Sequence, residues 1–376
     1  MSRALEGAPI QEVVLVGLGH AHLFVAARAA LFRRQGLRLT LIDDGAFWYS
    51  SIGSGLLGGR YEREDDVIEA DAFAARCGIL YRRGRAVAVD RERREVVLQD
   101  GKRVAYDLVS LNVGSQVSPP FPCELDAPNV WAPKPIAGLL DLRATLREAF
   151  TRGELVRLVT VGGNHSGAEL TANATALARA EGGRIEATLV TDGSELVSNE
   201  PPGARRAMRR VLEDYGVTVR TGTRVASVDG EAVVLEGGER IAHDHAIVAT
   251  GLAASPLVMA CDLAADPRRG LLVTPQLHAP GDDRVFAAGD CANIREHDLP
   301  KVGVFGVRAS PVLTRNLLRR AQRLVPDRYS PQRVWFAAQN LGDGTGLASW
   351  GPVWWRGRSA LWLKDWNDRR FMRLYR

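Results

Sequence analysis

The sequence predicts an α/β protein with two parallel-sheet domains, the second inserted in the first, and a C-terminal appendage. A unit of strand, glycine turn, helix and strand at residues 13–43 recurs at residues 156–192, which indicates two domains of the same type. Each unit continues into short alternating apolar segments, which predict a β-meander, and then into a buried strand that ends at glycine. Strand-like segments between 270 and 290 return to the first domain, and a helix is expected at about 303–323.

These patterns set the expected boundaries. The first domain comprises residues 1–118 and 254–325, and the second comprises residues 119–253. The remaining segment, 326–376, is rich in tryptophan and arginine. A chain of 376 residues has the length for two domains and a short appendage.

Charge and cysteine content exclude several classes of protein. The net charge of +5 is concentrated in the last twenty-odd residues, so a basic tail is expected and a nucleic-acid partner is not. The four cysteines form no C-x-x-C pair, which argues against a metal site or a disulfide scaffold and favours a reducing cytoplasm. The start of the chain lacks the apolar stretch of a signal peptide. We expect a cytoplasmic protein, at most peripheral on the inner face of the cytoplasmic membrane.

The first glycine turn predicts a Rossmann-like dinucleotide site. Gly17 permits the tight turn, and Gly19 lets the backbone approach a pyrophosphate at the start of the helix. Asp43, at the end of the next strand, is placed to bind a ribose hydroxyl. His22 stands where the usual fingerprint has glycine or alanine, and simple packing of the helix start is the alternative role for it and for His20.

The second turn keeps two glycines of the fingerprint and changes one. Asn164 stands at the middle glycine position, and its side chain could weaken or alter the binding of a nicotinamide nucleotide. The following strand ends at Thr191-Asp192, with no arginine in the next turn to bind a 2′-phosphate. We therefore expect NADH in preference to NADPH.

The most specific motif is the apolar strand that runs into Gly289-Asp290. A carboxylate at the end of a buried strand needs hydrogen-bond donors, and the ribityl chain or the neighbourhood of a pyrophosphate would supply that setting. Together with Ala249-Thr250-Gly251, it predicts a flavin dinucleotide, FAD, in the first domain.

Residues 12–325 resemble the FAD-dependent pyridine nucleotide–disulfide oxidoreductase superfamily, above all its type II NADH dehydrogenase and sulfide:quinone reductase branch. The segments VLVGLGHAHL, LVSLNVGS, LPKVGVFGVR and NLGDGTGLASWGP are most similar to the NADH-dehydrogenase-like module often joined to selenophosphate synthetase (selenide, water dikinase).

The resemblance implies two sets of cofactor-binding residues. Within the FAD set, Ser51 lies in a segment that passes the isoalloxazine ring, Ala86 lies in a backbone strand that meets the adenine, and Val302 precedes a helix that points at flavin C2=O. The FAD set is Gly17, Gly19, His22, Asp43, Ser51, Ala86, Gly114, Gly289, Asp290 and Val302. The NADH set is Gly162, Gly163, Asn164, Gly167 and Gly251.

Three residues are candidates for catalysis. Glu169 could orient the nicotinamide or relay a proton, or could simply be favourably placed at a helix N-terminus. Lys301 could stabilise the reduced flavin. Lys134, in the connection between the domains, could reach the flavin cleft or remain an ordinary surface lysine.

Departures from the superfamily limit the chemistry. Serines stand where disulfide reductases carry a C-x4-C pair, so their dithiol relay is excluded. Cys123 and Cys291 are expected to be structural, which disfavours sulfide oxidation. The resemblance implies an oxidoreductase that passes electrons from NADH through flavin N5 to a small acceptor, with a quinone favoured. A flavoenzyme of selenium or sulfur metabolism and a flavin-binding protein without turnover are the alternatives.

The C-terminal segment has two interpretations. Read as a helix, it places Leu363, Trp366, Phe371 and Leu374 in one stripe flanked by arginines, which is typical of a helix lying on an anionic membrane. The alternative is that its tryptophans pack the tail onto its own domain or onto a second subunit of a homodimer.

Overall fold

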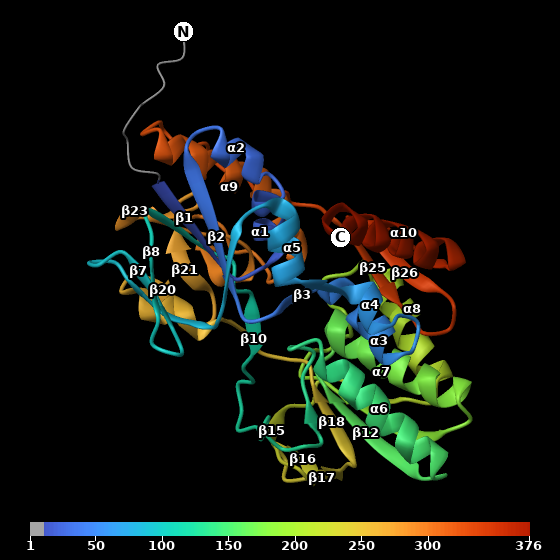
Figure 1. Cartoon of the computed structure of the whole chain (residues 1–376). Helices are drawn as coiled ribbons and strands as arrows, with labels where there is room; N and C mark the ends of the chain where they lie inside the picture. The colour runs from blue at the N-terminus through green and yellow to red at the C-terminus, as the bar shows by residue number, and fades with distance from the viewer. Residues whose placement is uncertain (1–10) are drawn as a thin grey trace.

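The computed structural model describes residues 11–376. Two parallel sheets form the centres of two Rossmann-like domains (Figure 1), which confirms the predicted fold class. The absence of a signal peptide was expected from the start of the chain, and residues 1–10 lie outside the described part.

The first sheet has the strand order β22-β23-β9-β1-β2-β5. All neighbouring pairs are parallel except β22 and β23. Val13 to Val16 are buried throughout, because a parallel sheet is covered on both faces. The strands are β1 (Gln11–Val16), β2 (Leu37–Asp43), β5 (Leu80–Arg83), β9 (Leu108–Leu111), β22 (His278–Ala279) and β23 (Asp282–Ala287). The helices α1 (His20–Ala26) and α9 (Gly303–Ala321) pack against each other beside this sheet.

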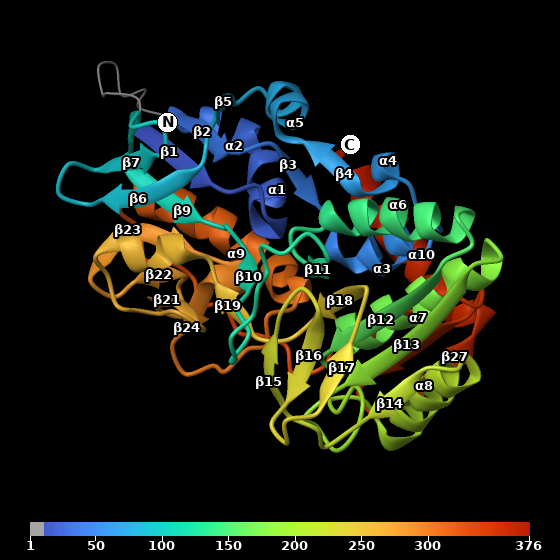
Figure 2. The same cartoon turned by 90° about the horizontal axis from the view of Figure 1, so that it is seen from below.

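The second sheet has the order β11-β18-β12-β13-β14 and is parallel throughout. Its strands are β11 (Val130–Trp131), β12 (Leu155–Val161), β13 (Arg184–Val190), β14 (Thr218–Arg220) and β18 (His245–Val248). The helices of this domain are α6 (Gly138–Thr151), α7 (His165–Ala180) and α8 (Pro202–Asp214). Helices α6 and α7 also contact α3 (Gly53–Leu57), which belongs to the first part of the chain, so α3 joins the two domains (Figure 2).

Both expected β-meanders are present. One is an antiparallel sheet of β6 (Ala86–Asp90), β7 (Glu95–Leu98) and β8 (Arg103–Ala105), and the other is a sheet of β15 (Val225–Val228), β16 (Ala232–Leu235) and β17 (Arg240–Ala242). Each meander leads into a central strand, β9 or β18, as predicted. Among residues 11–376, no helix is long and apolar enough to cross a membrane.

The C-terminal segment forms a three-stranded antiparallel sheet and a final helix. The sheet comprises β25 (Phe336–Asn340), β26 (Gly346–Trp350) and β27 (Val353–Gly357), and α10 (Arg358–Tyr375) lies across it. The sheet contacts α7 and α8 of the second domain. The end of α10 reaches the first domain, where Phe371 stacks on Tyr49 with ring centroids 4.6 Å apart. The tail therefore spans both domains (Figure 1).

The buried face of α10 differs from the predicted stripe. Leu361, Lys364, Asp368, Met372 and Tyr375 face inward, whereas Trp366 and Leu374 are exposed and Phe371 is half-buried. The hydrophobic pattern alone predicted the wrong buried face for α10, because two of the residues that face inward are charged. Lys364 and Asp368 form an ion pair with side chains only 2% and 3% exposed, and buried charges are tolerated when they are paired.

Candidate functional site: two glycine turns and a buried polar cluster between them

The first glycine turn has the backbone geometry of a dinucleotide site. Gly17 has φ +83°, a region that favours glycine, and its N–H donates to Ile42 O at 2.8 Å. Gly19 caps α1 without a side chain, and a Cβ there would lie 2.3 Å from Asn112 Oδ1. Asn112 accepts hydrogen bonds from the N–H groups of Ala21 and His22, at 2.9 and 3.2 Å. The sequence prediction missed Asn112, which lies about ninety residues from the helix that it caps.

Asp43 lies at the end of β2, against this turn. Its Oδ2 accepts from Leu18 N–H at 2.7 Å, and its Oδ1 accepts from Gly45 N–H at 2.9 Å. Burial raises the pKa of Asp43, although the hydrogen bonds from Gly45 and Leu18 oppose that shift. Its backbone O accepts from Gly84 N–H, two residues before Ala86 at the start of β6. The predicted ribose and adenine positions are thus neighbours.

His22 is buried between the turn and the sheet. Its Nδ1 lies 2.6 Å from Gly17 O and its Nε2 lies 2.8 Å from Ser110 Oγ. Burial lowers the pKa of His22 to about 4, so the ring is neutral at physiological pH. Because both ring nitrogens are used inside the protein, this geometry favours the packing role over cofactor contact.

Asp290 lies in a cluster of donors at the end of β23. Its Oδ2 accepts from Ser115 Oγ at 2.6 Å and pairs with Lys134 Nζ at 3.0 Å. Burial alone would raise the pKa of Asp290, but the Lys134 ammonium, the Ser115 hydroxyl and Lys301 together hold it below its usual range. Lys134 is therefore no ordinary surface lysine. Gly289 and Gly114, on either side of this cluster, both have positive φ, +72° and +69°.

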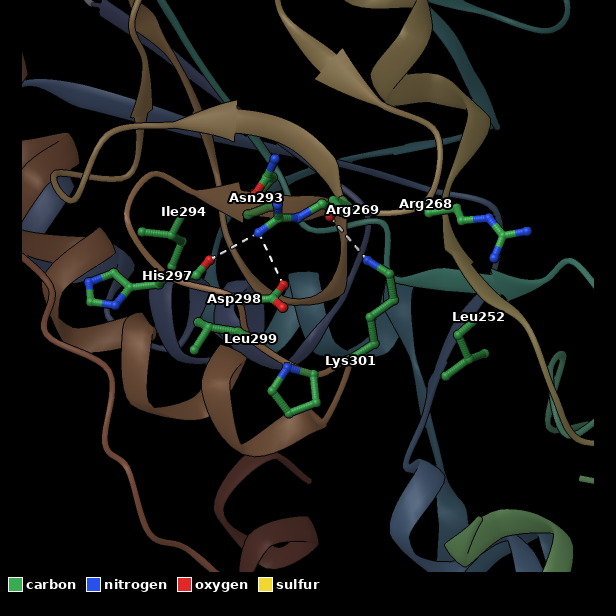
Figure 3. Close-up of a pocket in the computed structure, with 11 residues that line it drawn as sticks. Leu252, Arg268, Arg269, Asn293, Ile294, His297, Asp298, Leu299 and Lys301 are labelled. Carbon is green, nitrogen blue, oxygen red and sulfur yellow. Dashed lines mark hydrogen bonds and ion pairs between the residues drawn. The ribbon is translucent and has the colours of Figure 1, made fainter. Parts of the chain in front are cut away.

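Lys301 contacts backbone and not the carboxylate. Its Nζ donates to Asp290 O at 2.5 Å and to Arg269 O at 3.1 Å, and burial lowers its pKa. Val302 follows as the residue that caps α9. Lys301 lines an open cavity of about 300 Å³. Arg268, Arg269 and Leu252 also line it (Figure 3).

A buried polar cluster joins Ser51 to the C-terminal helix. Ser51 Oγ donates to Asp368 Oδ1 at 2.9 Å, and Lys364 Nζ donates to Ser51 O at 2.5 Å and pairs with Asp368 at 2.7 Å. Burial would lower the pKa of Lys364, but Asp368 and Glu169 raise it overall. The sequence prediction passed over this pair, although the Lys-x-x-x-Asp spacing on a helix was a visible signal.

Glu169 links the second domain to this cluster. Its Oε1 accepts from Ser54 Oγ at 3.0 Å and from Asn340 N–H at 2.6 Å. Burial raises the pKa of Glu169, and the Lys364 ammonium partly opposes that shift. A carboxyl group in this setting can hold or release a proton between the two domains.

In the second glycine turn, Asn164 serves as a helix cap. Its Oδ1 accepts from Gly167 N–H at 3.1 Å, and its Nδ2 donates to Ala249 O at 2.6 Å. Gly162 has φ +123°, and a Cβ on Gly167 would lie 1.9 Å from Gly162 O, so both glycines are required by the turn itself. Asn164 is exposed and part of the turn's own hydrogen bonding.

Two other glycines of the predicted NADH set are also tightly packed. A Cβ on Gly163 would lie 2.8 Å from the Thr191 side chain. Gly251 has φ +71°, and a Cβ there would lie 2.3 Å from Ser118 O, where the chain returns to the first domain. The close backbone approach that glycine allows is therefore used at both positions.

The cysteines lack the properties of a redox pair. Cys291 is fully buried and Cys123 is half-buried. Burial raises the pKa of each thiol to about 11, so neither is a thiolate at neutral pH. Ser51 and Ser54 stand in the region beside the predicted flavin site where a redox pair of cysteines would be expected.

The chain is similar in fold and sequence to known oxidoreductases. It is 24% identical over 318 residues to "Demethylphylloquinone reductase NdbB" of Synechocystis, covering 77% of this chain and 74% of that protein. The sulfide:quinone oxidoreductase of Aquifex aeolicus superposes with a TM-score of 0.81 at 17% identity, over 97% of this chain and 91% of that one. NDH2 of Plasmodium falciparum, solved with NADH, also gives 0.81, at 12% identity, over 98% and 97% of the two chains.

The sequence pattern of a single family covers most of the chain. The pyridine nucleotide-disulphide oxidoreductase family matches residues 11–314, a range that includes both glycine turns, Asp290 and the start of α9. The site residues fit FAD, since a turn whose two glycines allow close approach of the backbone, a fixed carboxylate at Asp43 and an ionised Asp290 lie along one edge of the first sheet. The chain belongs to the pyridine nucleotide-disulphide oxidoreductase family and is an FAD-dependent NAD(P)H oxidoreductase.

Proposed function

We propose that the protein passes electrons from NADH, through FAD in the first domain, to a quinone. The observation that carries this proposal is the contact between Glu169 and Ser54. It joins the helix that follows the second glycine turn to the segment that follows Ser51. When bound, FAD would supply the redox chemistry, taking a hydride from the nicotinamide and giving electrons to the acceptor.

The residues of the first domain have distinct tasks in this proposal. Gly17 and Gly19 hold the pyrophosphate against the start of α1, and Asp43 binds the adenine ribose. Asp290, kept ionised by Lys134, accepts hydrogen bonds from ribityl hydroxyls. The start of α9, at Val302, places the positive end of a helix dipole toward the flavin.

Glu169 is the proposed proton-handling residue. Reduction of a quinone consumes two protons, and a buried carboxyl group with a raised pKa can deliver one. Lys364 is close enough to influence that pKa, so the Lys364–Asp368 pair would tune the proton affinity of Glu169.

A quinone is favoured over a thiol or sulfide. Neither Cys123 nor Cys291 has the low thiol pKa needed for a sulfur relay, so electrons would leave the flavin directly. The similarity to demethylphylloquinone reductase, at 24% identity, supports the same choice of acceptor. The resemblance of the sequence motifs suggests a selenium or sulfur compound as the alternative substrate. The stopped-flow experiment therefore includes such compounds.

The exposed face of the tail supports a membrane location for that quinone. Trp350, Trp362 and Leu374 each have 65% of their surface exposed. Trp350 ends β26, whereas Trp362 and Leu374 lie on α10 together with the exposed Arg369, Arg370 and Arg373. Tryptophan and arginine together favour an anionic membrane surface, and we propose peripheral contact there.

Anaerobic stopped-flow spectroscopy tests the proposal. NADH should bleach the flavin absorbance, and a soluble quinone should restore it faster than selenium or sulfur compounds do. Glu169→Gln should slow reoxidation by the quinone roughly 10- to 100-fold, as removal of a general acid does. The exposed Glu154→Gln is the matched control and should react as the wild type does. Full flavin occupancy without bleaching by NADH or NADPH would refute the proposal.

A further inference from the structure

The two Rossmann-like domains can be aligned residue by residue at the end of the second strand of each. Gly17 N–H donates to Ile42 O, and Gly162 N–H donates to Val190 O, both at 2.8 Å. The next residues, Asp43 and Thr191, therefore occupy equivalent positions.

The side chains at these positions make equivalent hydrogen bonds. Asp43 Oδ1 accepts from Gly45 N–H at 2.9 Å, and Thr191 Oγ1 accepts from Gly193 N–H at 3.3 Å. Their backbone oxygens also accept from N–H groups that follow the neighbouring strand, at 3.0 Å from Gly84 after β5 and at 2.9 Å from Thr223 after β14. The sequences Asp-Asp-Gly and Thr-Asp-Gly thus match in order, and Asp192 corresponds to the second aspartate, Asp44.

Both side chains also lie against their glycine turns. Asp43 Oδ2 accepts from Leu18 N–H at 2.7 Å. A Cβ on Gly163, the residue equivalent to Leu18, would lie 2.9 Å from Thr191 Oγ1. Thr191 is nearly buried, whereas Asp192 is exposed. By its alignment with Asp43, the hydroxyl of Thr191, and not the carboxylate of Asp192, stands at the position that recognises a ribose in such domains.

This substitution changes the chemistry of ribose recognition. A carboxylate at this position accepts a hydrogen bond from the ribose 2′-hydroxyl of NADH and repels the 2′-phosphate of NADPH. A threonine hydroxyl can donate or accept a hydrogen bond and carries no charge.

A cation is also tied to the turn that follows Thr191. Arg205 forms an ion pair with Glu195, four residues after Thr191. The Arg205 Nε is buried and has no hydrogen-bond partner among residues 11–376. Because Glu195 already balances the charge of Arg205, tolerance of a 2′-phosphate would come from the missing carboxylate at position 191.

We infer that Thr191 determines nucleotide specificity, and that the second domain binds NADPH as well as NADH. The inference rests on the nucleotide site of the proposed function. It departs from the preference for NADH that the missing arginine in the turn after Thr191-Asp192 had suggested.

Calorimetric binding to the FAD-loaded protein separates this inference from electron transfer. The probes are ADP-ribose and its 2′-phosphate, which lack the nicotinamide and cannot reduce the flavin. In the wild type their Kd values should differ less than about tenfold, or 1.4 kcal/mol. Thr191→Asp should weaken binding of the phosphorylated probe about 10- to 100-fold relative to binding of ADP-ribose, which is the effect of one charge-assisted contact. Thr191→Asn introduces a side chain with the shape of aspartate but without its charge, and it should leave the ratio of the two Kd values unchanged.

The outcomes that overturn the inference are distinct. A wild-type preference for ADP-ribose beyond about a hundredfold contradicts it even if Thr191→Asp does not fold. A ratio that responds to Asp192→Asn but not to Thr191→Asp would assign ribose recognition to Asp192. Failure of both probes to bind overturns the inference together with the nucleotide site. If both probes bind but neither NADH nor NADPH reduces the flavin, only the proposed function is refuted.

Discussion

Lys134 extends from the segment between the two domains to Asp290, at the end of a strand of the first domain. The pair is partly buried, with side chains 26% and 13% exposed, and Ser115 donates to the same carboxylate oxygen. This arrangement keeps a carboxylate ionised where burial would otherwise protonate it. A fixed negative charge beside polar donors is what a ribityl chain requires.

We therefore predict that Lys134→Met weakens FAD binding by roughly tenfold, the cost of a disturbed charge-assisted hydrogen bond. Fluorescence titration of the apoprotein with FAD measures this change. Lys102→Met, which breaks the exposed pair with Asp100, is the control and should bind FAD normally.

The same variant carries a pH signature. The pKa of Asp290 is lowered in the folded protein, so its stabilising contribution is present above the unfolded pKa and is lost as pH falls through the lowered, folded pKa. Without the Lys134 ammonium, that loss should begin at higher pH. Thermal unfolding across the acid range detects the shift, and superimposable acid profiles for wild type and variant would contradict it.

Single residues were predictable where a local motif identifies them. Gly17, Asp43 and Asp290 stand at positions that the strand and turn pattern fixes. Asn112 was not predictable in this way, because its partners lie about ninety residues away, and the bond from Ser51 to Asp368 joins residues 317 positions apart. Asn164 required the structure as well, since the hydrogen bond that its Oδ1 accepts from Gly167 N–H shows that it caps its helix.

Helix α10 is the element that the sequence described least well. Its amphipathic pattern suggested one apolar stripe, but the buried face contains the Lys364–Asp368 pair. Polar groups are buried there because Ser51 supplies further hydrogen bonds from the first domain. A pattern of hydrophobicity cannot anticipate partners contributed by another element.

Lys364→Met should destabilise the protein by about 3–5 kcal/mol, because it leaves the Asp368 carboxylate buried without a counter-charge. Lys364→Met combined with Asp368→Leu should recover most of that loss, since an apolar pair replaces a buried ion pair at little cost. Urea unfolding of the two variants measures the difference. A double variant no more stable than the single one would show that the pair is held by packing and not by charge.

At the scale of the whole molecule, the repeat of one unit was enough to predict two Rossmann-like domains, because the glycine turn and the following acid or threonine are local features. The domain boundaries at 118, 253 and 325 remain predictions. The bridging role of the tail could not be predicted, since α10 contacts Tyr49 of the first domain while its sheet contacts α7 and α8 of the second. Only the folded arrangement shows that one segment holds both domains.

That bridging tail leaves an aromatic and basic face unpaired among the described residues. Trp362 and Trp366 are one turn apart on α10, and Arg370 lies over the Trp366 ring at 5.4 Å. Because this face lies opposite the buried Lys364 and Asp368, membrane contact and packing onto the protein use different sides of one helix.

We predict that the protein co-sediments with vesicles containing phosphatidylserine, and binds neutral vesicles less, because the arginines are attracted to an anionic surface. The double variant Trp362→Ser, Trp366→Ser should reduce vesicle binding about tenfold or more, since tryptophans that insert into the lipid interface supply much of the affinity of an interfacial helix. Flavin reduction by NADH should be unchanged. Leu31→Ser, at an exposed position of α2 (Ala29–Arg33), is the control. Equal binding to neutral and anionic vesicles would exclude the charge mechanism. A tryptophan-dependent dimer in gel filtration, without vesicle binding, would instead assign this face to a second copy of the chain.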